Sequence, residues 1–296
     1  MRNASSMWRA DARRARWILS APLLAFIALA VIYPIFYGVR TALQHRTLLD
    51  PTSSWAGVAN FTTVLGDSGF WHAVGFTLQF TLIVTVVELL LGFALALLCD
   101  RHFPGKKALL SVLILPIMIA PALMGVMFRL LLNQDIGMFP ALLQKAGIHI
   151  TLFGNHAVVP MLMILDIVQW TPFTFLLFYA GLQTVPRDLY EAAAVDGAGY
   201  LRMVRSVLLP LMVPIVLITG FLRAIDAFRT FDVIYVLTGG GPADKTTTMS
   251  IYIYKLFSTG NFGTASAAAV LAALLMLPMV PIVVRRLATT GTETTR

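Results

Sequence analysis

The sequence predicts an all-α membrane protein with six transmembrane helices. The chain of 296 residues is 58% hydrophobic and only 12% charged, which is too apolar for a soluble domain of this length. Several runs of about twenty apolar residues are long enough to cross a bilayer as helices. Helices satisfy their own backbone hydrogen bonds in lipid, and the alternating pattern of a membrane barrel is missing.

Six segments have the length and apolarity of membrane spans. As helices they would measure roughly 30 to 45 Å, enough to cross with some tilt. The first is longer than the apolar run of a signal peptide, and no small-residue cleavage site follows it, so we expect it to remain as an anchor. The expected spans are residues 17–39, 72–99, 108–132, 157–181, 207–237 and 264–284.

The distribution of lysine and arginine predicts the orientation. The N-terminal tail, the loops after the second and fourth spans, and the C-terminal tail carry five, three, three and three of them, fourteen in all, whereas the other loops carry five. Positive loops stay inside, so we expect a multi-pass protein of the bacterial plasma (inner) membrane with both termini cytoplasmic. The expected domains are a basic tail over 1–16, a six-helix transmembrane domain over 17–284 and a cytoplasmic tail over 285–296.

Motifs of catalysis and of cofactor binding are missing from the sequence. There is no G-x-x-x-x-G-K-[ST] loop and no H-E-x-x-H pair, and the five histidines are scattered. The single cysteine, Cys99, can form neither an internal disulfide nor a thiolate metal site. We therefore expect no enzyme, no metal and no cofactor in this chain, and any nucleotide-driven step would need a separate ATPase. The net charge of +8 follows from the loop asymmetry and does not indicate nucleic-acid binding.

A charged, alanine- and glycine-rich stretch, EAAAVDGAGYLRMVRSVLLPL, separates the fourth and fifth spans at residues 191–211. Asp188 and Glu191 fall early in a short helix, where negative charge is favoured. Gly197 permits a sharp turn, after which a second helix begins. By itself, an ordinary capped surface helix explains this loop, which we place at 185–206, equally well.

The spacing of this stretch resembles the EAA signature of importer permeases in the ATP-binding-cassette (ABC) superfamily. Glu191-Ala192-Ala193, Asp196-Gly197-Ala198 and Leu209-Pro210 are similar to the pattern of the sugar-permease branch, of the maltose/trehalose type. Two further stretches carry the same resemblance, although Gly75-Phe76-Thr77 departs from it at a position where Asn-Thr is common. They are AGVANFTTVLGDSGFWHAVGFT at 56–77 and FDVIYVLTGGGP at 231–242.

The resemblance implies the type I ABC importer permease fold with a cytoplasmic coupling helix that docks into an ATPase subunit. The residues implied in this contact are Glu191, Ala192, Ala193, Asp196 and Gly197, supported by Arg202 and Arg205. It also implies a second homologous permease, two ATP-binding-cassette subunits that hold ATP and Mg, and an extracytoplasmic solute-binding protein. The imported solute would be a sugar, with a di- or oligosaccharide expected.

Polar and aromatic residues within two spans are the candidates for the substrate pathway. In the fourth span, Asp166, Gln169, Trp170 and Phe173 share one helix face and suit a sugar, whose hydroxyls take hydrogen bonds and whose C–H face stacks on rings. We expect Asp166 and Asp226 to approach one cavity. Further candidates are Asp226, Asp232 and Tyr235 for the pathway and Gly239, Gly240, Gly241 and Pro242 for an external loop or gate.

Simpler explanations remain for several of these residues. Arg223 and Arg229 alternate with aspartates at steps of three, so these charges can neutralise one another along the helix. Glu88 can pair with a partner chain and Arg129 can snorkel. A plain external turn accounts for the glycine run.

Other functions also stay open at this point. They are an ion-gradient-driven secondary transporter of a small polar solute, a membrane scaffold, and the same importer role with a polyol or glycerol-phosphate compound.

Overall fold

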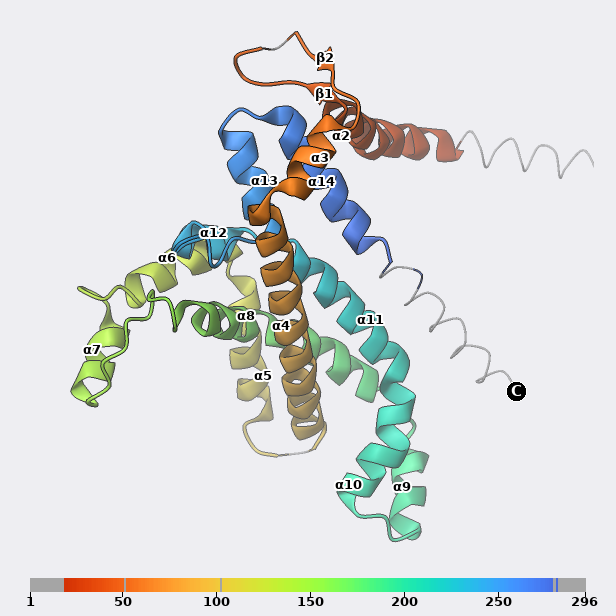
Figure 1. Cartoon of the computed structure of the whole chain (residues 1–296). Coiled ribbons are helices and arrows are strands. Elements are labelled where there is room, and N and C mark those ends of the chain that lie inside the picture. The colour runs from red at the N-terminus through yellow and green to blue at the C-terminus, as the bar shows by residue number, and fades with distance from the viewer. Residues whose placement is uncertain (1–18, 51, 102, 279–280, 282–296) are drawn as a thin grey trace, which may run out of the picture. The chain divides into compact units, whose positions relative to one another are not determined.

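The computed structural model describes residues 19–278, except 51 and 102, together with residue 281 (Figure 1). The predicted tails 1–16 and 285–296 lie outside the described residues. The chain divides into two units, the first made of Met1–Gly66 and Leu256–Leu271 and the second of Asp67–Lys255 and Ala272–Arg296. The fold within each unit is described separately.

The first unit is organised around a long N-terminal helix and a small hairpin. Asn60 is buried, and its amide nitrogen donates to the backbone oxygens of Ala42 at 2.8 Å and Gln44 at 2.9 Å. Asn60 of the stretch 56–77 thus ties the helix end to the hairpin. The elements are η1 (Ala28–Ile32), α2 (Tyr33–Ala42), β1 (Gln44–His45), β2 (Ser54–Trp55), α3 (Ala59–Gly66) and most of α14 (Phe262–Met276), with β1 and β2 antiparallel.

The second unit is built on three helices that contact one another (Figure 1). They are α4 (Ser68–Asp100), α8 (Val158–Leu182) and α11 (Leu209–Phe228). Small residues let the helix backbones come close, as is common between membrane helices. A Cβ on Gly92 of α4 would lie 2.8 Å from the backbone nitrogen of Phe175 in α8. A Cβ on Gly181 of α8 would lie 2.9 Å from the methyl carbon of Met212 in α11.

The remaining elements of this unit flank those three helices. In chain order the unit contains α4 (Ser68–Asp100), α5 (Lys106–Ile114), η2 (Leu115–Met118), α6 (Pro121–Leu131), α7 (Met138–Lys145), α8 (Val158–Leu182), α9 (Arg187–Val195), α10 (Tyr200–Met203), η3 (Val204–Leu208), α11 (Leu209–Phe228), α12 (Asp232–Thr238) and most of α13 (Met249–Ser258).

Candidate membrane spans agree in part with the six that the sequence predicts. Among the described residues four helices are long and apolar enough to cross a bilayer, or five if one bent pair is a single span. The helix that contains the expected fifth span is continuous from Tyr200 into α11 through η3, and Pro210, which has no N–H to donate, follows this wider turn. The four are Leu19–Ala42, Ser68–Asp100, Val158–Leu182 and Tyr200–Thr238.

The expected third span is broken in the structure. Lys106–Met118 and Pro121–Leu131 meet at an angle of 96°. Pro116 lies in the tight turn η2, and Pro121 pushes the preceding residue into an extended conformation, so a straight helix cannot pass. The expected sixth span, 264–284, corresponds to the shorter apolar helix α14, and residues 279–280 and 282–284 of it lie outside the described residues.

Candidate functional site

A buried cluster of charged side chains joins the three central helices of the second unit. Arg223 of α11 is 1% exposed and lies between Glu88 of α4, which is 0% exposed, and Asp166 of α8, which is 4% exposed. The Arg223 Nη2 donates to Glu88 Oε1 at 3.0 Å and also bonds to Asp166 Oδ2, while Nε lies 2.5 Å from Glu88 Oε2. The guanidinium also lies over the Trp170 ring, 5.1 Å from its centroid. Burial of these charges is therefore compensated by pairing within this chain.

The charges continue from the buried cluster toward the end of α11. Asp226 accepts from Arg223 Nη1 at 3.4 Å and from Arg229 Nη2 at 3.1 Å. Arg223 and Arg229 each lie three positions from Asp226 and pair with its carboxylate, so these charges neutralise one another. Asp166 and Asp226 contact different nitrogens of the same guanidinium, Nη2 and Nη1, and Glu88, whose partner the sequence left open, pairs with Arg223 of its own chain.

The other candidates of the fourth span divide into two kinds. Gln169 is buried, and its amide donates to the backbone oxygen of Ile119 at 3.2 Å. Trp170 and Phe173 are half-buried, with ring centroids 6.3 Å apart in an edge-to-face arrangement. The polar members of this face are therefore committed to their own chain, and the aromatic members are the more accessible ones.

An aromatic cluster surrounds Tyr235 at the start of α12. Phe231 stacks on Tyr235 with centroids 4.9 Å apart, and Tyr254 of α13 packs 5.0 Å from Tyr235. Tyr235 and Tyr254 are exposed, as is Asp232 beside them. Tyr254 was not singled out in the sequence, since it lies 19 positions beyond Tyr235 and no spacing rule connects them.

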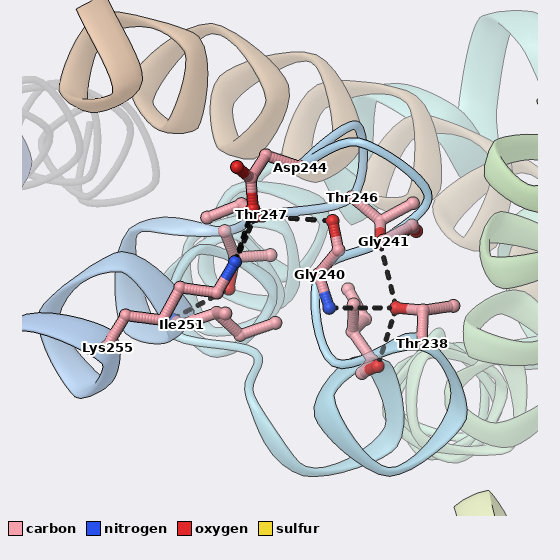
Figure 2. A network of polar contacts seen from close by, with 10 residues as sticks. Thr238, Gly240, Gly241, Asp244, Thr246, Thr247, Ile251 and Lys255 are labelled. Atoms are coloured by element: carbon pink, nitrogen blue, oxygen red, sulfur yellow. Dashed lines mark hydrogen bonds and ion pairs between the residues drawn. The ribbon is translucent and has the colours of Figure 1, made fainter. Parts of the chain in front are cut away.

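The glycine run Gly239–Pro242 forms a fixed loop rather than an open turn (Figure 2). The Thr246 hydroxyl donates to the Gly241 oxygen at 2.7 Å and lies 2.8 Å from the Thr238 hydroxyl. Gly239 and Gly240 have positive φ of 61° and 95°, a region that favours glycine. A Cβ on Gly240 would also lie 2.6 Å from the Thr247 hydroxyl, so side chains are excluded there.

An ion pair holds the far side of this loop. Lys255 Nζ donates to Asp244 Oδ1 at 2.5 Å and to the Thr247 hydroxyl at 3.2 Å (Figure 2). The Lys255 hydrogen bond holds the pKa of the Asp244 carboxyl below its usual range. The loop and the last turn of α13 are thus joined by side-chain contacts.

The stretch that carries the EAA pattern folds as a hairpin of two helices, α9 and α10. We call it the coupling hairpin (residues 187–203), after the role that the sequence resemblance implies. Gly197 forms the turn between them with a φ of +68°, as the sequence predicts. Ala193 is buried, whereas Val195 and Leu201 are 87% and 79% exposed. Glu191, Ala192, Asp196, Gly197, Arg202 and Arg205 are also exposed.

The inner face of the coupling hairpin is held by polar contacts. The Tyr190 hydroxyl donates to Asp100 at the end of α4. Burial, followed by the neighbouring Asp100 charge, raises the pKa of Tyr190 to about 12, so this hydroxyl stays protonated. No local pattern indicates this contact, because the two residues are 90 positions apart in the sequence.

No cluster of three or more His, Cys, Asp or Glu side chains that could hold a metal ion occurs within the described part of the chain. The arrangement contains buried ion pairs, exposed aromatic rings and an exposed helical hairpin.

Comparison with known proteins gives one consistent family. Residues 88–289 match the family described as "Binding-protein-dependent transport system inner membrane component". The chain is 32% identical over 263 residues to the trehalose/maltose transport system permease protein MalF of Thermococcus litoralis, covering 88% of this chain and 89% of that one. It is 35% identical over 261 residues to the trehalose transport system permease protein SugA of Mycobacterium tuberculosis, covering 88% and 84%.

A solved structure shares the fold. It is the crystal structure of a bacterial ABC transporter involved in the import of the acidic polysaccharide alginate, matched with a TM-score of 0.82 at 23% identity over 96% of this chain and 99% of that chain. The extent of the family match, together with the two relatives, decides the assignment. The chain belongs to the family of binding-protein-dependent transport system inner membrane components, the non-enzymatic permease subunits of ABC importers whose ATPase is a separate chain.

Proposed function

We propose that this chain forms half of the translocation pathway for a sugar and that the coupling hairpin is its contact with an ATPase subunit. The observation that carries the proposal is the pair of exposed apolar side chains on the hairpin, Val195 and Leu201. They lie on a short helical segment whose other face is fixed to α4. Apolar side chains outside the lipid-facing segments favour burial by another protein.

The residues implied in the ATPase contact take distinct places in this proposal. Glu191, Ala192 and Asp196 lie exposed on α9 and at its end, where a partner can reach them. Gly197 sets the turn. Ala193 supports the helix from its buried side, so we expect it to act through packing rather than through direct contact.

The proposed topology keeps six spans with both termini in the cytoplasm. The bent pair α5–α6 serves as the third span, and α14 with the residues beyond it serves as the sixth. The permease domain covers 17–284 between the tails 1–16 and 285–296, and the coupling loop covers 185–206. Lys and Arg on the proposed inner loops support this orientation.

The proposed assembly contains a second homologous permease, two ATP-binding-cassette subunits and an extracytoplasmic solute-binding protein. ATP and Mg would be held by the ATPase subunits, and this chain would bind no cofactor. The glycine loop Gly239–Pro242 would lie on the outer side as a fixed support for the start of α13 rather than as a mobile gate.

The proposed solute is a di- or oligosaccharide. Exposed rings of Tyr235 and Tyr254, beside Asp232, offer the stacking faces and hydrogen-bond acceptors that a hydroxyl-rich ring requires. Trp170 and Phe173 would line the same pathway deeper in α8. Asp166 and Gln169, which are bound to their own chain, would act behind these rings, and Asp226 would contact solute only on its exposed side.

Cross-linking tests the ATPase contact. In a Cys99→Ser background, Val195→Cys should cross-link to the ATPase subunit in membranes that contain the whole complex. Ile136→Cys is the matched control, because Ile136 is also a highly exposed aliphatic residue but lies on the proposed outer side. Cross-linking of the control alone, or of neither variant, would contradict the proposal.

Uptake by the reconstituted complex with its binding protein tests the solute. Labelled trehalose or maltose should accumulate with ATP, and Tyr235→Ala should raise the half-saturating concentration. Tyr235→Phe should retain most uptake, because stacking needs the ring. Uptake of glycerol 3-phosphate instead of either sugar would support the alternative solute class, and uptake driven by an ion gradient without ATP would contradict the importer role.

A further inference from the structure

The last turn of α4 contacts the first arm of the coupling hairpin through one carboxylate. Asp100, the final residue of α4, accepts from the Tyr190 hydroxyl at 3.2 Å through Oδ2. Its Oδ1 accepts from the Gln183 amide at 3.1 Å, at the end of α8. Asp100 thus joins α4, α8 and α9 at one point.

The same turn of α4 also reaches the second arm. The guanidinium of Arg101 lies over the Tyr200 ring, 3.9 Å from its centroid. The Tyr200 hydroxyl lies 3.4 Å from the backbone oxygen of Leu97, which makes a weak hydrogen bond. Both arms of the hairpin therefore rest on residues 97–101.

A directed contact adds to the apolar packing of α9, whose Tyr190 packs against a buried cluster that includes Ala96 and Cys99 of α4. Asp100 and Tyr190 both line a cavity of about 470 Å³ that Lys106, Arg187 and Glu191 also line. Packing is incomplete around the pair, so its geometry depends on the hydrogen bond.

The chain itself connects the hairpin to only two of the three central helices. Residues 183–186 lead into it from α8, and α10 continues through η3 into α11. The end of α4 has no such covalent connection and meets the hairpin through non-covalent contacts. At its middle, α4 is tied to α11 by the buried Glu88–Arg223 pair.

We propose that Asp100 is a positioning residue for energy coupling, whose carboxylate carries a displacement of the hairpin to α4. This rests on the proposed ATPase contact of the hairpin. With Asp100 in place, α4, α8 and α11 shift together when the ATPase moves the hairpin. Without it, α8 and α11 follow the hairpin and α4 lags, so ATP is hydrolysed with less transport.

The test compares transport and ATP hydrolysis in the complete complex, reconstituted in liposomes with the binding protein. Tyr190→Phe, which removes only the hydroxyl, and Asp100→Asn should each lower solute transported per ATP roughly three- to tenfold, the range for losing one charge-assisted bond at a partly exposed site. The double variant should be no worse than the more affected single variant, since Tyr190→Phe removes the donor and Asp100→Asn removes the charge of the acceptor in the same hydrogen bond. Tyr33→Phe, which removes the hydroxyl of an exposed tyrosine outside the hairpin and α4, is the matched control and should behave as the parent.

Each result decides the inference. Unchanged transport per ATP in Tyr190→Phe, with Val195→Cys still cross-linking to the ATPase, would overturn the role of Asp100 and leave the proposed function intact. An equal fall in both rates would also overturn it, because that indicates weaker ATPase docking rather than poorer coupling. If Val195→Cys fails to cross-link in the parent complex, the proposed function fails first. Should Asp100→Asn not assemble, Tyr190→Phe alone decides.

Discussion

Replacing Arg223 with methionine is the sharpest test of the buried charge cluster. Methionine keeps much of the volume, but it leaves Glu88 and Asp166 without a counter-charge among apolar helices. Removing one member of a buried pair costs about 3–5 kcal/mol, and about 1 kcal/mol shifts the melting temperature of a chain of comparable size by ~2–4 °C. We expect the melting temperature of the purified protein in detergent, followed by tryptophan fluorescence, to fall on the order of 10 °C.

Two comparisons separate lost pairing from a general effect of the substitution. Arg229→Met removes an arginine whose side chain is 72% exposed and pairs only with Asp226, so the cost should stay below about 1 kcal/mol. The triple variant Arg223→Met, Glu88→Gln, Asp166→Asn leaves no unpaired charge and should recover part of the lost stability. Equal shifts for Arg223→Met and Arg229→Met, or no recovery in the triple variant, would refute the reasoning.

Three further outcomes follow from the packing and the loops. Gly92→Ala should cost about 1–3 kcal/mol by forcing α4 from α8, whereas Gly75→Ala, with open space around it, should melt as the parent does. Asn60→Ala should cost about 1–3 kcal/mol and speed amide exchange in β1, and unchanged exchange there would contradict its role. The lowered pKa of the Asp244 carboxyl makes its contact with Lys255 stabilising at neutral pH, and this stabilisation is lost as the pH falls below about 4. Lys255→Met should remove this pH dependence. Equal protection of the parent loop from amide exchange at pH 3 and pH 7 would contradict this.

Much of the helical architecture could be predicted from hydropathy and from Gly and Pro. The expected span bounds lie within a few residues of the ends of the helices Ser68–Asp100 and Val158–Leu182, because their apolar runs are long and bounded by polar residues. Gly197 was expected to turn the hairpin, and it does. The bend at Pro116 and Pro121 was missed, because apolar composition alone does not distinguish a straight span from a broken one.

The site was harder to predict because its contacts link distant parts of the chain. The charges at 223, 226 and 229 can be recognised as a helical series, but nothing local shows that Arg223 reaches Glu88, 135 positions away. The spacing places Asp166, Gln169, Trp170 and Phe173 on one face of a helix, but it does not show that the two polar members bond to their own chain. Periodicity shows which residues share one face of a helix, but it does not show which other residues that face contacts.

The most direct measurement of the proposed function is purification of this chain, tagged at its C-terminus, from native membranes in mild detergent, with its companions identified by mass spectrometry. We expect an ATP-binding-cassette subunit and a second permease in stoichiometric amounts, and ATP hydrolysis that rises when the binding protein is added with its sugar. A chain that purifies alone, and that moves solute on an ion gradient without ATP, would contradict the importer role.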